Sequence, residues 1–204
     1  MSALKISPLG KRDSSEAARV LSLAMVSCPI HVAVFQGQDD EVRRVQELMF
    51  DRMLRQHPGI VYVARLDGQM AGVLRMKSCH GLEASQPEAD EGSLHDTASR
   101  LGHWQAVWAQ RDPREPHWHL GPVGVLPPLQ GSGVGAALMQ RFCREVDARQ
   151  AVAFLETDQS RTAVFYQRFG FQVVDQVDIF GVTNYFMWRP PGQNYREEGG
   201  SDND

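Results

Sequence analysis

The sequence is poor in cysteine, and its three cysteines follow no known spacing pattern. Cys28, Cys79 and Cys143 lie far apart in a chain of 204 residues. This argues against a disulfide framework and against the closely spaced ligand pairs of a zinc knuckle. No apolar run approaches the length of a membrane span, and the first ten residues lack the apolar core of a signal peptide. We therefore expect a cytoplasmic protein without a metal site or a membrane segment.

An excess of positive charge is also missing. The formal net charge is −4, and no cluster of lysine and arginine stands out, so nucleic acid is not an expected partner. A hydrophobic content of 42% with 23% charged residues is ordinary for a globular protein. The length predicts one domain, which we place at 1–190. The polar, acidic and glycine-rich stretch 191–204 is expected to be a disordered tail.

The strongest local signals lie between His117 and Val146. The first part, His117 to Val125, is an apolar run between prolines, which predicts a buried strand. A helix is expected next, because apolar residues recur at helical spacing at Val134, Ala137, Leu138, Phe142 and Val146. Between them, three glycines alternate in the segment Q-G-S-G-V-G at 130–135. Glycines at the start of a helix leave backbone N–H groups open to a ligand, so we expect an anion site here.

The glycine segment taken alone does not identify a ligand. Tight packing at the start of the helix needs no ligand at all. A Walker phosphate loop is excluded because no Gly-Lys-Ser/Thr follows. The run Gly131-x-Gly133-x-x-Ala136, with Glu156 further on, matches the fingerprint of an NAD(P)-dependent oxidoreductase. Against it, the segment Leu126–Gln130 separates the strand from the first glycine, whereas that fingerprint follows its strand almost directly.

Two segments together resemble one family. Val123–Gly135 reads V-G-V-L-P-P-L-Q-G-S-G-V-G and is similar to the pyrophosphate loop of the GCN5-related N-acetyltransferases, the GNAT family. The second part of that signature follows at Phe165–Phe171, F-Y-Q-R-F-G-F. Within the family, the C-terminal third looks most like puromycin N-acetyltransferase and its relatives. The resemblance implies the GNAT fold, an α/β (α+β) arrangement with a mixed, mostly antiparallel sheet of six to seven strands, about four flanking helices and a splay between the central strands.

The resemblance also implies a reaction, in which acetyl-CoA donates its acetyl group directly to the amine of a small molecule within a ternary complex. The backbone of Val123 and Val125 would pair with the pantetheine arm, and N–H groups from Gly131 to Ala136 would hold the pyrophosphate. The expected cofactor-binding residues are Val123, Gly124, Val125, Gln130, Gly131, Ser132, Gly133, Val134, Gly135 and Ala136. A non-catalytic acyl-CoA sensor of the same fold is the alternative. Relatives are commonly dimers, so a homodimer is expected.

Three residues are the main catalytic candidates. Tyr166 occupies the family position of the acid that protonates the departing sulfur, although a tyrosine among phenylalanines also suits a hydrophobic core. For the base, the candidates are His119 and Glu156. His117 shares a strand face with His119 by the period of two and is a weaker candidate. A histidine on a strand is more often structural than catalytic, so these roles stay open.

The remaining segments give the expected framework. Helices are predicted from Ser14 to about Ser27 and from Asp39 to His57, and Asp67-Gly68 predicts a hairpin turn between two strands. Five residues of the second helix are expected to point inward: Val42, Val45, Leu48, Met49 and Met53. Residues 80–116 are expected to form an insertion with an exposed loop at 81–93 and a helix over 94–110. This insertion is either part of a substrate lid or a passive elaboration. Four of its side chains are candidates to line an acceptor pocket, although tryptophans at helical spacing also suit a core: His95, His103, Trp104 and Trp108.

Overall fold

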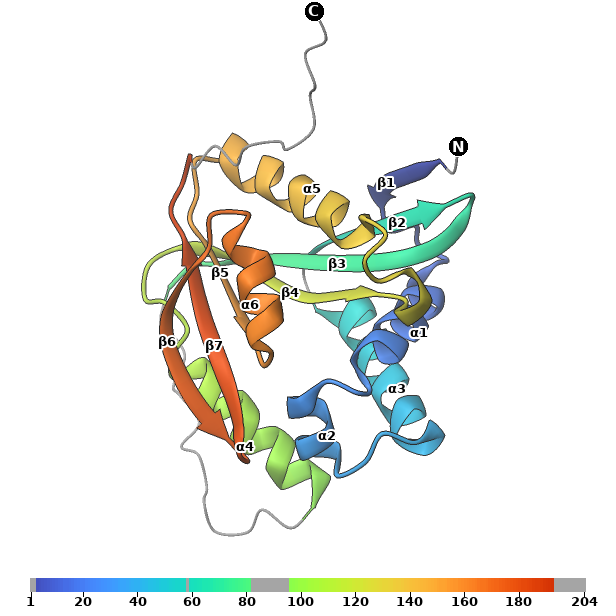
Figure 1. Cartoon of the computed structure of the whole chain (residues 1–204), viewed down its shortest axis with the longest axis vertical. Coiled ribbons are helices and arrows are strands. Elements are labelled where there is room, and N and C mark those ends of the chain that lie inside the picture. Colours follow the sequence, from blue (N-terminus) through green and yellow to red (C-terminus); the bar gives the residue numbers. More distant parts are fainter. Residues whose placement is uncertain (1–2, 58, 82–95, 193–204) are drawn as a thin grey trace, which may run out of the picture.

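Seven strands form one sheet in the computed structural model, which describes residues 3–57, 59–81 and 96–192. The strand order is β1-β2-β3-β4-β5-β7-β6, and every neighbouring pair is antiparallel except β4 and β5 (Figure 1). The expected mixed and mostly antiparallel sheet is therefore confirmed. The elements are β1 (Leu4–Pro8), α1 (Ser14–Met25), α2 (Pro29–Phe35), α3 (Asp40–Gln56), β2 (Ile60–Leu66), β3 (Gln69–Cys79), α4 (Thr97–Ala109), β4 (His117–Val125), a 3₁₀ turn (Pro127–Leu129), α5 (Val134–Ala148), β5 (Ala153–Thr157), α6 (Ser160–Gln167), β6 (Gln172–Ile179) and β7 (Val182–Arg189).

Two glycines in the central strands show which helix covers which face of the sheet. A Cβ atom on Gly72 of β3 would meet the side chains of Val134 and Leu138 at 3.1 Å, so α5 packs closely on that face. A Cβ atom on Gly124 of β4 would meet the Ala24 side chain at 3.0 Å, so α1 packs on the opposite face. The absence of side chains lets both helices approach the sheet backbone.

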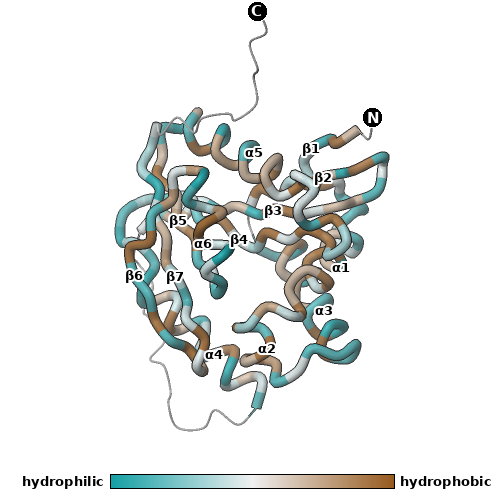
Figure 2. The backbone as a smooth tube through the Cα atoms, in the orientation of Figure 1, coloured by the Kyte–Doolittle hydropathy of each residue, from teal (hydrophilic) through white to brown (hydrophobic). Residues whose placement is uncertain are grey.

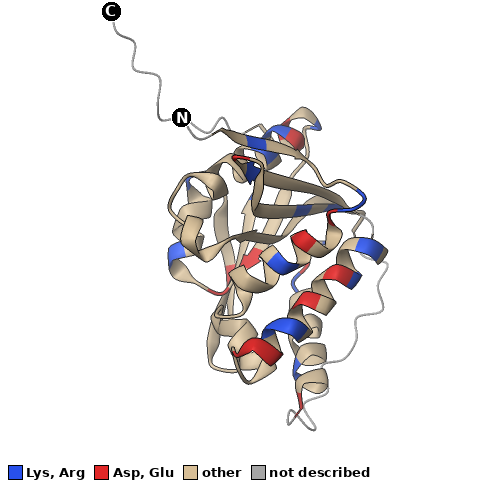
Figure 3. Ribbon diagram, turned by 90° about the vertical axis from the view of Figure 1, so that its right-hand side faces the viewer, with Lys and Arg blue, Asp and Glu red and all other residues tan. Residues whose placement is uncertain are grey.

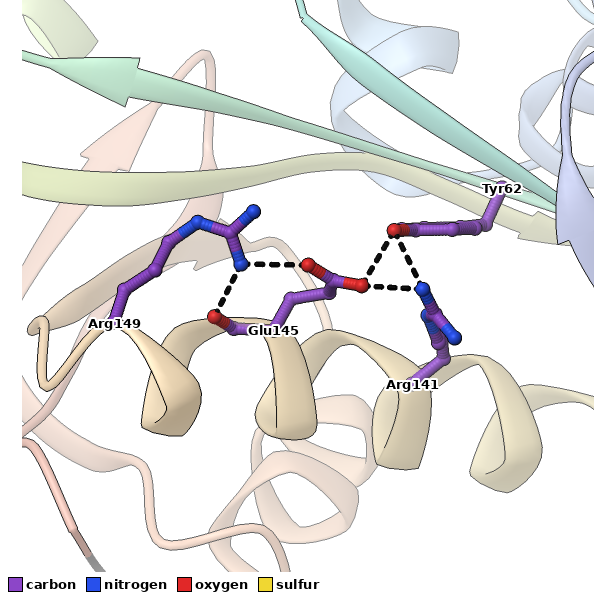
Figure 4. Close-up of polar contacts among 4 residues, drawn as sticks. All are labelled: Tyr62, Arg141, Glu145 and Arg149. Carbon is purple, nitrogen blue, oxygen red and sulfur yellow. Dashed lines mark hydrogen bonds and ion pairs between the residues drawn. The ribbon is translucent and has the colours of Figure 1, made fainter.

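Helix α5 is also fastened to β2 by a polar network (Figure 4). The Tyr62 hydroxyl donates to a Glu145 carboxylate oxygen at 2.7 Å, and Arg141 donates to the Tyr62 oxygen at 3.0 Å. Arg141 also contacts Glu145, and Arg149 donates to both the carbonyl and the carboxylate of Glu145 at 2.6 Å. Because Glu145 accepts from three side chains, its pKa is lowered, first by the Tyr62 hydrogen bond.

A buried ion pair joins the end of α5 to the last strand. Both guanidinium end groups of Arg189 donate to the Asp147 carboxylate, at 2.7 and 2.9 Å, and its Nε donates to the Phe169 carbonyl at 2.8 Å. The Arg189 side chain is fully buried. A buried guanidinium needs such complete pairing, since removing one partner leaves an uncompensated charge.

The inward face of α3 differs from the expected one. Val45 and Leu48 are 48% and 72% exposed, and the fully buried positions are Gln46 and Phe50. Gln46 can be buried because its carbonyl oxygen lies 3.2 Å from Nδ1 of His31 on α2. Figure 2 shows α3 as largely hydrophilic and α1 as more hydrophobic. The predicted inward positions Val45 and Leu48 are therefore wrong.

Two other predicted segments, the hairpin and the helix of the insertion, are present in the structure. The expected hairpin forms, with Asp67 and Gly68 both at positive φ as a tight two-residue turn requires. A helix is present in the insertion, as α4 (Thr97–Ala109). Helix α2, which begins at Pro29, is not among the predicted elements, because Cys28-Pro29 indicates only the end of α1. Most of the expected loop at 81–93 and most of the expected tail at 191–204 lie outside the described residues.

Taken together, the helices that the structure describes carry residues of both charge signs. Figure 3 shows acidic and basic residues interspersed along the helices of one side of the molecule. Among the described residues, no single helix combines the length and apolar composition needed to cross a membrane. Helices α1 and α2 meet those two criteria only when taken together, with a bend of 98° between them.

Candidate functional site

The parallel pair β4 and β5 separates part of the way along the sheet. Pairing is limited to Trp118 with Ala153 and His119 with Phe154, whereas β4 stays paired with β3 up to Val125. Beyond His119, the edge of β4 that faces β5 therefore has no strand partner within the described part of the chain. That edge, Leu120–Val125, lines a cavity of about 1310 Å³. The expected splay between the central strands is confirmed.

The glycine segment lies at one end of this cavity and opens α5. Gly131 and Gly133 adopt φ values of 79° and 88°, which residues that carry a Cβ atom rarely adopt. No side chain caps α5, and Ala137 N–H, bonded to the Gly133 carbonyl at 3.0 Å, begins the helical hydrogen-bond pattern. The N–H groups of Gly133 to Ala136 thus have no partner within the helix. Their shared direction, with the positive end of the helix dipole, suits an anion.

Two side chains of this loop are engaged in hydrogen bonds to nearby backbone carbonyls, which hold the loop in its conformation. The Gln130 amide donates to the Val125 carbonyl at 3.3 Å, and the Ser132 hydroxyl donates to the Leu129 carbonyl. Val134, the first residue of α5, is buried in the core. Among the ten expected cofactor-binding residues, the groups free for a ligand are therefore mainly backbone N–H groups.

His119 and Glu156 meet across the point where β4 and β5 separate. Nε2 of His119 lies 2.7 Å from Oε2 of Glu156, and both residues line the cavity. Burial alone lowers the pKa of His119, but Glu156 and Cys79 offset this and raise it to about 9. At neutral pH the pair therefore combines a protonated imidazole with a carboxylate that is almost entirely buried.

His117 lies on the same face as His119, as the strand period predicts, with the ring centroids 6.4 Å apart. Its side chain is fully buried and does not line the cavity. Burial lowers the pKa of His117, whereas its contacts with Asp112 and Cys79 raise it to about 10. Of the two strand histidines, only His119 reaches the cavity.

Tyr166 belongs both to the core and to the cavity, the two places that the sequence leaves open for it. Its ring packs in the core against Phe165 and Phe171, at centroid distances of 5.5 and 6.1 Å, and the residue is 8% exposed. It also lines the cavity. Burial raises the pKa of the phenol, and the nearby Cys28 and Asp158 raise it further. The phenol therefore keeps its proton throughout the physiological range.

Two polar contacts near Tyr166 have no counterpart among the sequence predictions. Oδ2 of Asp158 accepts the backbone N–H of Ile30 at 2.8 Å and so ties the start of α2 to the end of β5. Gln159 donates to the sulfur of Cys28 at 3.5 Å. Burial, followed by the charge of Asp158, raises the pKa of Cys28 to about 12. These contacts join residues about 130 positions apart, so the sequence holds no local signal for them.

Aromatic residues of α4 also line the cavity. Trp104 is buried and stands edge-on to His31 at 5.3 Å. Trp108 donates its indole N–H to the Asn184 side chain at 3.1 Å. Both tryptophans line the cavity, as expected for the insertion, whereas His103 packs on Phe180. His95, another expected pocket residue, lies outside the described residues.

Known proteins share this sequence pattern and this fold. A model of the acetyltransferase (GNAT) family matches residues 27–171. A histone acetyltransferase and related acetyltransferase from Corynebacterium glutamicum is 21% identical over 95% of this chain and 99% of that chain, with a TM-score of 0.69. A GNAT family acetyltransferase from Brucella melitensis, solved with acetyl-CoA, is 18% identical over 94% and 90%, with a TM-score of 0.56. Arylalkylamine N-acetyltransferase 2 from Aedes aegypti is 10% identical over 93% and 99%, with a TM-score of 0.70.

Proposed function

Because the chain belongs to the acetyltransferase (GNAT) family, we propose that it transfers the acetyl group of acetyl-CoA to the amine of a small molecule. The observation that carries the proposal is the open edge of β4, which leads along the cavity to the uncapped first turn of α5. The strand edge offers hydrogen bonds to an extended amide chain, and the helix offers N–H groups to a pyrophosphate. Acetyl-CoA carries these two groups in the same order.

The expected cofactor contacts fit this path. We assign the backbone of Val123 and Val125 to the amides of the pantetheine arm, and the N–H groups from Gly131 to Ala136 to the pyrophosphate. When bound, acetyl-CoA supplies an acetyl group activated as a thioester. Its reactive end then lies where β4 and β5 separate, beside Glu156 and Tyr166.

Acetyl transfer to an amine needs one group that accepts a proton and one that donates a proton. In the proposed reaction, Glu156, which forms an ion pair with the protonated His119, takes the proton that the amine loses as its nitrogen bonds to the carbonyl carbon. Tyr166 donates its phenolic proton to the sulfur as the carbon–sulfur bond breaks. Burial raises the pKa of Tyr166, so the phenolic proton is present at the start of the reaction.

The role of the pair can be tested without changing its shape. Glu156→Gln keeps the size of the side chain and a hydrogen bond to His119 but removes the negative charge. We expect kcat to fall about 100-fold, at the lower end of the usual range for general base catalysis. Wild-type kcat in this variant, measured by thiol release at saturating substrates, would remove the pair from the mechanism.

The acceptor is proposed to be a small amine with an apolar or aromatic part. The wall of Trp104 and Trp108 supports this class, because these rings offer flat apolar surface inside the cavity. The Aedes aegypti neighbour is an arylalkylamine N-acetyltransferase, which fits the same chemistry. The likeness of the C-terminal third to puromycin N-acetyltransferases adds antibiotics with a free amine to the acceptors worth screening.

The first experiment is calorimetry of the purified protein with acetyl-CoA, CoA and NADH in parallel, followed by thiol detection with a panel of amines. Binding of acetyl-CoA and amine-dependent thiol release would support the transferase. Binding without thiol release for any amine would favour a non-catalytic acyl-CoA sensor. If CoA and acetyl-CoA both fail to bind, the proposal is wrong, and an NADH signal in their place would favour the oxidoreductase.

A further inference from the structure

A second cluster of reactive side chains lies beside the acetyl-transfer site but is not part of it. Cys79 ends β3, His117 begins β4, and Asp112 follows α4. One ligand atom from each of these residues lies within 4.8 Å of the corresponding atoms of the other two. None of the three lines the cavity, so the proposed acetyl transfer leaves all of them without a role.

The orientation of His117 is the most informative feature of this cluster. Its Nδ1 lies 2.9 Å from the Glu115 carbonyl oxygen, and because a carbonyl can only accept, Nδ1 carries the hydrogen. Binding of a metal ion displaces the proton from Nε2, which then presents a lone pair toward Asp112 and Cys79. Nε2 lies 3.3 Å from Oδ1 of Asp112 but makes no hydrogen bond, although the His117 side chain is fully buried.

This is the arrangement of a metal-binding histidine. A histidine ligand commonly donates its second ring nitrogen to a backbone carbonyl, which fixes both the tautomer and the ring orientation. Nitrogen and oxygen ligands about 2.1 Å from a tetrahedral zinc ion stand about 3.3 Å from each other, which is the separation of Nε2 and Oδ1 here. A thiolate, an imidazole and a carboxylate together suit zinc better than magnesium or calcium, which prefer oxygen ligands.

We infer that Cys79, Asp112 and His117 bind a divalent transition-metal ion of the zinc type. The ion joins three segments that are distant in sequence: the end of β3, the chain after α4 and the start of β4. Asp112 also lies within 4.8 Å of the ligand atoms of His119 and Glu156, so the ion adjoins the proposed catalytic pair. The predicted role is to hold the end of the 80–116 insertion against the sheet beside the cavity.

The test uses the full chain, dialysed against a chelator and then titrated with Co²⁺ and with Zn²⁺. Cobalt bound to a thiolate gives a charge-transfer absorption band in the near ultraviolet, which reports the Cys79 contact directly. The variants are Cys79→Ser and His117→Gln, and Cys28→Ser is the matched control, because Cys28 is a half-buried cysteine outside the cluster. Circular dichroism checks that each variant folds.

We expect one equivalent of Co²⁺ and the band in the wild type and in Cys28→Ser. Cys79→Ser should lose the band, and His117→Gln should bind at least about 10-fold more weakly. In the wild type, Zn²⁺ should also protect Cys79 from alkylation by iodoacetamide, which needs no variant. Absence of the band in the wild type, its persistence in Cys79→Ser, or unchanged alkylation with Zn²⁺ would each overturn the inference. None of these measurements depends on acetyl transfer.

Discussion

The two halves of the cavity differ in whether backbone groups or side chains line them. The half at the start of α5 consists mainly of backbone groups from one continuous stretch, the edge of β4 and the glycine segment 130–136. The half under α2, α3 and α4 consists of side chains such as His31, Leu48 and Trp104, which come from three separate helices. The first half can therefore bind the same group in many sequences, whereas the second half depends on each side chain.

In the proposed reaction, this difference separates recognition of the cofactor, by the half at the start of α5, from recognition of the acceptor, by the half under α2, α3 and α4. Backbone N–H groups are present whatever the side chains are, provided that glycine permits the loop conformation. A side-chain wall changes shape with every substitution. Changes in the two halves should therefore have separable effects, and Tyr166, which lies between them, should affect chemistry more than binding.

The largest effect is expected at Tyr166. Tyr166→Phe removes only the hydroxyl group and keeps the ring contacts with Phe165 and Phe171. We expect kcat to fall about 1000-fold, within the usual range for general acid catalysis. The Kd of acetyl-CoA, measured by calorimetry, should stay within about 2-fold. An unchanged kcat would leave the core as the sole role of this tyrosine.

The next effect is a pH-dependent loss in the free energy of unfolding, caused by His31 in the half of the cavity under α2, α3 and α4. His31 is 6% exposed, and burial lowers its pKa to about 4, although Gln46 opposes the shift. Between pH 6.5 and 4 the unfolded chain binds a proton that the folded chain does not bind, so stability falls as the pH is lowered. The loss at this residue should reach about 3 kcal/mol near pH 4.

Urea unfolding at several pH values checks this prediction. His31→Gln should lose that part of the pH dependence, whereas His57→Gln, at an exposed histidine, should keep it. An equal pH dependence in the wild type and His31→Gln would show that another group governs the acid sensitivity of the fold.

A smaller effect is expected in the cofactor half. Gly133 has a φ of 88°, so Gly133→Ala introduces about 1 to 2 kcal/mol of strain, which the loop can relieve by turning its N–H groups away. We expect acetyl-CoA to bind about 10-fold more weakly. Gly135→Ala is the control, because its Cβ would meet Val125 and Phe165 at ordinary contact distances of 3.7 and 3.8 Å. Equal losses in both variants would contradict a conformational role for Gly133.

The smallest effect is expected at Leu48. This side chain is 72% exposed yet lines the cavity, whereas Val45 on the same helix is 48% exposed and does not. Leu48→Ser should raise KM for an apolar amine about 3-fold, in keeping with the loss of a partly buried apolar contact. Val45→Ser should leave KM unchanged, and the KM of acetyl-CoA should be the same in both. A rise in the acetyl-CoA KM would place Leu48 in the other half.

Some side chains show why the sequence predicts the two halves unequally. The predicted inward face of α3 is wrong at Val45 and Leu48, because hydrophobicity alone assigns them to the core. Gln46 takes the buried position because His31, from another helix, supplies its hydrogen-bond partner. That partner is not visible in the pattern of α3 itself. The same holds for Cys79, whose neighbours Asp112 and His117 are distant in the chain.

The sequence by itself determined the strand, the glycine turn and the helix from His117 to Val146, and with them the family and the fold. These features follow from local rules of periodicity and backbone conformation, which neighbouring residues satisfy together. Only the tertiary structure decided that His119 meets Glu156, that Tyr166 belongs to both the core and the cavity, and that residues of α2, α3 and α4 line the cavity. Those contacts depend on how helices and strands that are distant in the chain pack together. The periodicity of one segment does not show which other segment packs against it.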